Sequence, residues 1–136
     1  MTRLPEIDPD YFKSTLEALL SIPSPSGYTD EIARWTMEEI QKMGIETELT
    51  RRGAIRARIP GTAAQPVRGV IAHLDTLGAI VRQLKDNGRL AVAPIGHWSS
   101  RFAEGARGTL FSEMGTFRGT ILPLKASGHV FADEVD

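Results

Sequence analysis

The sequence of 136 residues contains no cysteine. This absence excludes disulfide bonds, thiolate metal ligands and a thiol nucleophile. No segment approaches the roughly 18 apolar residues of a membrane-spanning helix, and the N-terminus lacks the apolar run of a signal peptide. With 16 Lys and Arg against 17 Asp and Glu, the chain also lacks the charge excess that attracts nucleic acid or an anionic membrane. We therefore expect a cytoplasmic protein with no nucleic-acid or membrane partner.

Apolar residues make up 41% of the chain and charged residues 24%, which is typical of a globular protein. Two helices are predicted in the first third. Asp8-Pro9-Asp10 marks the start of the first, which should end before Pro23. Thr29 or Asp30 can cap the second, and Gly44 is placed to end it.

Strand patterns follow the helices. Residues 45–49 and 55–59 alternate between apolar and polar, which predicts a hairpin with one solvated face. Residues 69–72 are continuously apolar, which predicts a strand covered on both faces. Two further hairpins are predicted around Asn87-Gly88 and around residues 113–115.

These elements predict an α/β layer architecture that changes to all-β near residue 79. We place a domain boundary there, with residues 1–78 in an α/β domain and residues 79–136 in a β domain. No long linker separates the two, so the second domain is expected to be inserted into the first.

The segment VIAHLDTLG, residues 70–78, holds the most suggestive pair of side chains. In extended chain His73 and Asp75 project to the same side, at the carboxyl end of the predicted buried strand. A neutral imidazole is a good metal ligand, and a neighbouring carboxylate can bind the same ion or orient the ring through its other nitrogen. An ordinary hydrogen-bonded pair would give the same pattern.

Other polar residues have simpler interpretations. His97 and His129 lie in the predicted β domain, where structural or surface roles explain them. Glu38 and Glu39 are adjacent on a helix and point in different directions. The serines at 24 and 26 are attributed to the turn between the helices.

The order and spacing of three segments carry a family resemblance. They are LLSIPSPSGYTDEIARW at 19–35, VIAHLDTLGAIVRQLKDNGRLAVAPIGHW at 70–98 and GARGTL at 105–110. Together they resemble the N-terminal part of the glutamyl or deblocking aminopeptidases, which are tetrahedral exopeptidases with two metal ions.

The resemblance implies an α/β/α zinc-exopeptidase sandwich with an inserted, PDZ-like β-barrel that builds homo-oligomers. It implies His73 as a metal ligand and Asp75 as the carboxylate of the catalytic site that orients it. The implied chemistry is hydrolysis of N-terminal residues from peptides by a hydroxide bound to two divalent ions, zinc or cobalt, with a glutamate as general base.

Two departures from the family pattern stand out. Thr76 replaces the usual glutamate, and the family's other ligands and its general base lie downstream of the inserted domain. We therefore expect at most one partial metal site and no activity in the isolated chain, since zinc needs three or four ligands. The alternatives are a non-catalytic β module for self-association or peptide binding, and a relative of the acylases and carboxypeptidases.

Overall fold

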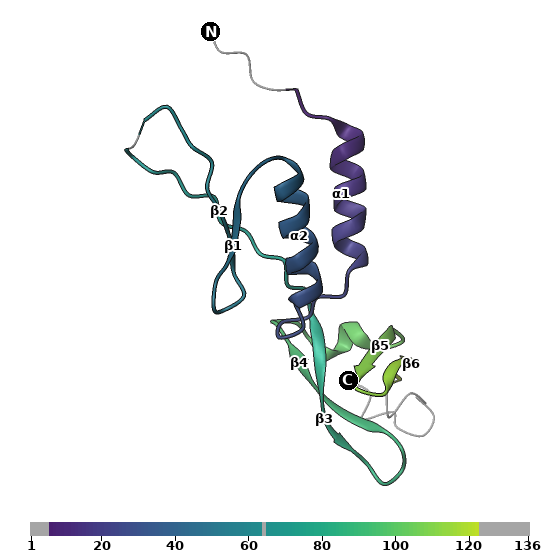
Figure 1. The fold of residues 1–136 in the computed structure, drawn as a ribbon. Helices are drawn as coiled ribbons and strands as arrows, with labels where there is room; N and C mark the ends of the chain where they lie inside the picture. Colours follow the sequence, from purple (N-terminus) through teal and green to yellow (C-terminus); the bar gives the residue numbers. More distant parts are fainter. Residues whose placement is uncertain (1–5, 64, 123–136) are drawn as a thin grey trace. The chain divides into compact units, whose positions relative to one another are not determined.

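The computed structural model describes residues 6–63 and 65–122, which divide into two compact units between Gly96 and His97 (Figure 1). Each unit is described by itself. The first contains two helices and two hairpins, and the second contains a short 3₁₀ helix and one hairpin. Within the described residues, no helix is long and apolar enough to cross a membrane.

Both predicted helices are present. Helix α1 spans Pro9–Ser21, with Asp8 accepting hydrogen bonds from the main-chain N–H groups of Asp10 and Tyr11. Helix α2 spans Asp30–Lys42. Thr29 occupies its N-cap position, although the threonine side chain makes no capping hydrogen bond. Gly44 follows the end of α2 with a φ of +77°, a conformation that favours glycine.

The first hairpin pairs β1 (Thr47–Leu49) with β2 (Ile55–Ala57) in the predicted antiparallel arrangement. Helix α2 packs against both strands. Its residues Ile32 and Ala33 form the buried apolar core of the described chain.

The second hairpin pairs β3 (Gly78–Leu84) with β4 (Leu90–Ile95), with a register shift between Val81 and Gln83. The turn follows the Asn-Gly prediction. Its positive φ, +76°, falls on Gly88, and no non-glycine residue of the described chain has a positive φ. The left-handed conformation is therefore confined to the residue that has no Cβ.

The second unit contains the 3₁₀ helix η1 (Ser100–Ala103) and the antiparallel strands β5 (Arg107–Ser112) and β6 (Gly115–Thr120). This hairpin confirms the prediction around residues 113–115. Residues 121 and 122 follow β6 without strand structure, and residues 123–136 lie outside the described residues.

The buried strand predicted over residues 69–72 is wrong for the described structure. These residues form no strand, and Val70 and Ile71 are 98% and 96% exposed. A strand requires hydrogen-bonded neighbours, and no strand of the described residues lies beside this segment. The nearest pairing is an isolated parallel bridge between Pro25 and Thr76.

The observed fold is thus a small mixed α/β arrangement of two helices and three two-stranded sheets in the described residues. It is compatible with the N-terminal part of a peptidase domain. The inserted PDZ-like barrel and the boundary near residue 79 stay predictions.

Candidate functional site

The turn between the two helices forms one side of the candidate site. Tyr28 donates a main-chain hydrogen bond to the carbonyl of Pro25 at 2.7 Å, which closes a four-residue turn. Gly27, third in that turn, has a φ of +91°. A positive φ at this position is the requirement of a type II turn, and glycine meets it without a steric penalty.

This turn is fastened to the segment that carries His73 and Asp75. The N–H of Thr76 donates to the carbonyl of Ser24 at 2.8 Å, and the hydroxyl of Ser24 donates to the carbonyl of Leu74 at 3.0 Å. Ser24 is fully buried. Residues 24–28 and 74–76 are therefore held together by main-chain and buried side-chain hydrogen bonds.

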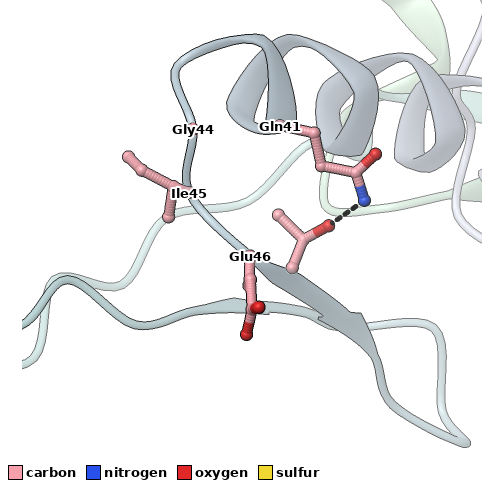
Figure 2. A pocket seen from close by; sticks show the side chains of 5 residues that line it. Gln41, Gly44, Ile45 and Glu46 are labelled. Carbon is pink, nitrogen blue, oxygen red and sulfur yellow. Dashed lines mark hydrogen bonds between the residues drawn. The ribbon is translucent and has the colours of Figure 1, made fainter.

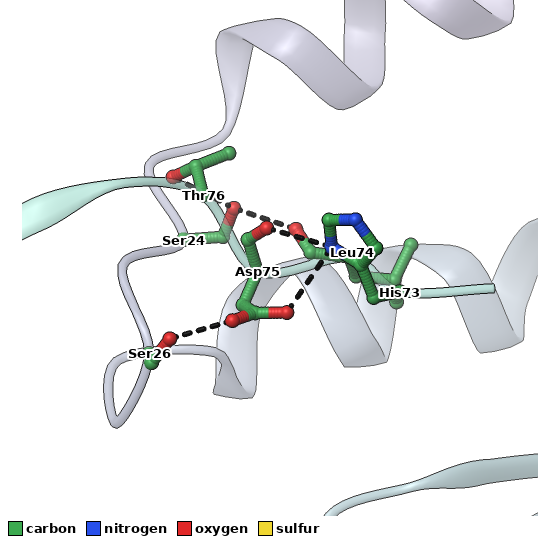
Figure 3. A network of polar contacts seen from close by, with 6 residues as sticks. All are labelled: Ser24, Ser26, His73, Leu74, Asp75 and Thr76. Carbon is green, nitrogen blue, oxygen red and sulfur yellow. Dashed lines mark hydrogen bonds and ion pairs between the residues drawn. The ribbon is translucent and has the colours of Figure 1, made fainter. Parts of the chain in front are cut away.

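His73 and Asp75 meet as the sequence predicted (Figure 3). Nδ1 of His73 lies 3.2 Å from Oδ1 of Asp75 and 3.0 Å from the main-chain oxygen of the same residue. Both oxygens can only accept a hydrogen bond, so a neutral ring places its proton on Nδ1. Nε2 then carries the lone pair.

The second carboxylate oxygen of Asp75 is also engaged. The hydroxyl of Ser26 donates to Oδ2 at 2.5 Å. This hydrogen bond is the main reason why the pKa of Asp75 lies below its ordinary value. Partial desolvation opposes the shift, while the main chain of Asp75 and the His73 ring add to it. Asp75 is therefore held as a carboxylate that can accept hydrogen bonds from both Ser26 and His73.

The arrangement leaves Nε2 of His73 available to a ligand. The His73 side chain is 84% exposed, and no hydrogen bond of Nε2 is found among the described residues. An imidazole with Nδ1–H held by a carboxylate and Nε2 open suits a transition-metal ligand. The described residues hold no group of three His, Cys, Asp or Glu side chains able to bind a metal ion. No reaction step through a metal ion can be built from them.

The other sequence candidates differ in where they lie in the chain. His97 is exposed and belongs to the second unit, and His129 lies outside the described residues. Glu39 pairs with Lys42 along α2, while Glu38 is exposed. Glu38 is therefore solvated, whereas Glu39 is partly buried and paired along the helix.

An open hollow lies where α2 leads into β1, and Figure 2 shows the residues that line it: Gln41, Gly44, Ile45, Glu46 and Thr47. The amide of Gln41 donates to the hydroxyl of Thr47 at 2.7 Å, so these two polar groups satisfy each other. Glu46 is the one charged residue among the five. The hollow offers no set of convergent polar groups and contains no residue of the His73 network.

Sequence reasoning missed the contacts of Ser24 and Ser26, whose side chains were attributed to the turn alone. The turn is present, but both hydroxyls reach residues about fifty positions away in the chain. The sequence offered two hydroxyl groups in a loop and no local pattern that pointed to their distant partners.

Known proteins similar to this chain are aminopeptidases by name. The family model described as M42 glutamyl aminopeptidase matches residues 53–136. The chain is 34% identical over 119 residues to the protein named "Putative aminopeptidase YhfE" of Bacillus subtilis (strain 168), covering 87% of this chain and 34% of that protein. It is 27% identical over 101 residues to the glutamyl aminopeptidase of Lactococcus lactis subsp. cremoris (strain MG1363), covering 74% and 28%.

The chain thus spans about a third of the length of the curated relatives it matches. The family model covers more than half of the chain, including His73, Asp75 and all of the second unit. The resemblance inferred from the three sequence segments is confirmed. The matching family and relatives support a peptidase function at the level of the family. The chain belongs to the M42 glutamyl aminopeptidase family.

Proposed function

We propose that this chain supplies the first metal ligand of a metal-dependent aminopeptidase that removes N-terminal residues from peptides. His73 binds one of two divalent ions, zinc or cobalt, through Nε2. Asp75 is the residue that orients the ring. The observation that carries this proposal is the pair of acceptors around Nδ1, at 3.0 and 3.2 Å, which leaves Nε2 as the free ring nitrogen.

The chain's own residues contribute orientation and basicity. Asp75 holds the proton on Nδ1, fixes the tautomer and makes the imidazole a stronger donor to a cation. The exposure of the ring leaves its outer edge open to further ligands and to a peptide. When bound, the metal would supply a hydroxide nucleophile and polarise the scissile carbonyl.

No observation favours the alternative of a non-catalytic β module. The acylase or carboxypeptidase alternative shares the His-x-Asp pair, but the matching family and both curated relatives are aminopeptidases by name. We therefore propose peptides with a free N-terminus as the substrate class.

The test uses the natural gene product that carries this sequence, assayed on amino-acid p-nitroanilides with zinc or cobalt. We expect His73→Ala to lower kcat/KM by more than about 100-fold, and Asp75→Asn to lower metal affinity by about 10- to 100-fold, the range typical of outer-shell changes. Metal content after dialysis gives a second readout.

The matched control is His97→Ala, which removes an exposed imidazole from the second unit. We expect this variant to keep activity and metal content within about twofold, as surface substitutions do. Wild-type metal content in His73→Ala, or a wild-type protein without aminopeptidase activity, would contradict the proposal.

A further inference from the structure

We propose that Ser26 is a positioning residue for His73 and acts through the carboxylate of Asp75. The inference rests on the proposed role of His73 as a metal ligand. It extends the orienting network by one residue, into the turn between the two helices.

The carboxylate of Asp75 is engaged at both of its oxygens. Ser26 Oγ donates to Oδ2 at 2.5 Å, while Oδ1 faces Nδ1 of His73 at 3.2 Å. A carboxylate is planar, so holding one oxygen restricts where the other points. The Asp75 side chain is 44% exposed, and packing alone therefore leaves it freedom that the Ser26 hydrogen bond removes.

The main chain around Ser26 is itself held in place. It lies in the turn closed by the hydrogen bond from Tyr28 to Pro25, beside the fully buried Ser24. Ser24 joins this turn to Leu74 and Thr76 through three polar contacts that do not involve the Asp75 side chain. The Ser26 hydroxyl therefore has a defined position relative to the main chain of Asp75.

The His73 ring is largely exposed, so few packing contacts restrain its orientation. Among the described residues, it is restrained by two oxygens of Asp75, one on the main chain and one on the side chain. Loss of the Ser26 hydrogen bond would loosen the side-chain restraint and leave the main-chain one. We therefore expect a partial effect, smaller than that of replacing Asp75.

The experiment compares Ser26→Ala and Ser26→Thr with the wild-type natural gene product. One readout is the imidazole ¹⁵N chemical shifts of His73 in metal-free protein at about pH 8, above the ordinary titration range of imidazole. The other is zinc affinity, measured by competition with a chromophoric chelator. We expect Ser26→Ala to reduce the population of the Nδ1–H tautomer and to weaken zinc binding about three- to tenfold. This loss is smaller than the one expected for replacing Asp75, which contacts the ring itself.

Two variants control for structure. Ser26→Thr keeps the hydroxyl and should stay within about twofold of wild type. Ser21→Ala removes a serine hydroxyl that donates to the Glu17 carbonyl within α1 instead of to Asp75, and should leave both readouts unchanged. Ser26→Cys retains the shape with a weaker donor and replaces the alanine variant if that variant does not fold.

A double-mutant cycle separates action through Asp75 from a general effect. In an Asp75→Asn background, Ser26→Ala should cause no further loss of zinc affinity. Equal losses in both backgrounds would overturn the proposal, as would an unchanged tautomer in Ser26→Ala. If wild-type protein binds no zinc through His73, the proposed function fails, whereas the tautomer measurement still decides the role of Ser26.

Discussion

Pro25 and Gly78 meet where the turn between the helices lies against the first residue of β3. A Cβ added at Gly78 would lie 2.6 Å from the Cβ of Pro25, a separation that real side chains do not show. The requirement at this position is space, which only glycine provides. The close approach allows Thr76 to pair with the turn and keeps Ser26 within reach of Asp75.

We therefore predict that Gly78→Ala pushes the turn away from residues 74–76. The expected cost is about 1–3 kcal/mol in the free energy of unfolding, the range for overpacking. Zinc affinity should fall with it, because the Ser26 hydrogen bond lengthens. Denaturant unfolding and chelator competition on the same preparation measure the two effects.

The matched control is Gly108→Ala in β5. Gly108 is also a strand glycine, and a Cβ there meets no atom within 4 Å. Its effect on stability should stay within about 0.5 kcal/mol. Equal stabilities for the two variants, with unchanged zinc affinity in Gly78→Ala, would show that the contact with Pro25 does not hold the turn in place.

The helices and hairpins were predictable because their signals are local. Asp8 and Pro9 mark the start of α1, and Gly88 marks the turn between β3 and β4. Each signal depends on the conformation of a few neighbouring residues. The boundaries differ from the prediction by a few residues in the first hairpin, where both strands are shorter than their alternating patterns.

The prediction of a buried strand at residues 69–72 was wrong because a buried strand depends on distant parts of the chain. An apolar run predicts a covered strand, but the cover and the hydrogen-bonding neighbours come from other parts of a protein. The described residues provide neither, so Val70 and Ile71 are exposed. The contact of Ser26 with Asp75 was missed for a related reason: it joins residues far apart in the chain, and no local pattern reports it.

Capping offers a test of the local signals, since the two helices begin differently. Asp8 accepts two main-chain hydrogen bonds at the start of α1, while the Thr29 side chain makes none at the start of α2. We predict that Asp8→Ala costs α1 about 1 kcal/mol, the typical value of an N-cap. Amide hydrogen exchange in α1 should accelerate about fivefold.

Thr29→Ala is the matched control, because it alters an N-cap position without removing a capping hydrogen bond. Exchange in α2 should change by less than about twofold. Asp8→Ser should restore slow exchange in α1 because serine also caps well. Unchanged exchange in Asp8→Ala would mean that the cap does not limit the stability of α1.

Many large apolar side chains of the described residues are exposed, and this exposure affects whether the molecule associates with itself. Helix α1 has no buried residue, and Phe12 and Leu20 are exposed on it. The segment at Val70 and Ile71 adds two nearly fully exposed β-branched residues without strand partners among the described residues. Isolated two-stranded hairpins are marginal in water, so such surfaces need cover.

We predict that residues 1–136, produced by themselves, self-associate and bind a hydrophobic dye. Unpaired main-chain groups beside exposed apolar side chains are a template for intermolecular strand pairing. Light scattering should show a mass that rises with concentration. Replacing Val70 and Ile71 together by lysine should reduce association, because charges at such a segment oppose pairing.

The same double substitution should leave the helical circular dichroism signal unchanged, because neither side chain is buried in the described structure. Met114→Lys, at an exposed turn residue of the second unit, is the comparison: it adds charge without touching the unpaired segment. If it lowers association as much as the double variant, added lysine in general is the cause and strand pairing at residues 70–71 is not. A monomer at all concentrations would contradict the prediction that the exposed apolar residues drive association.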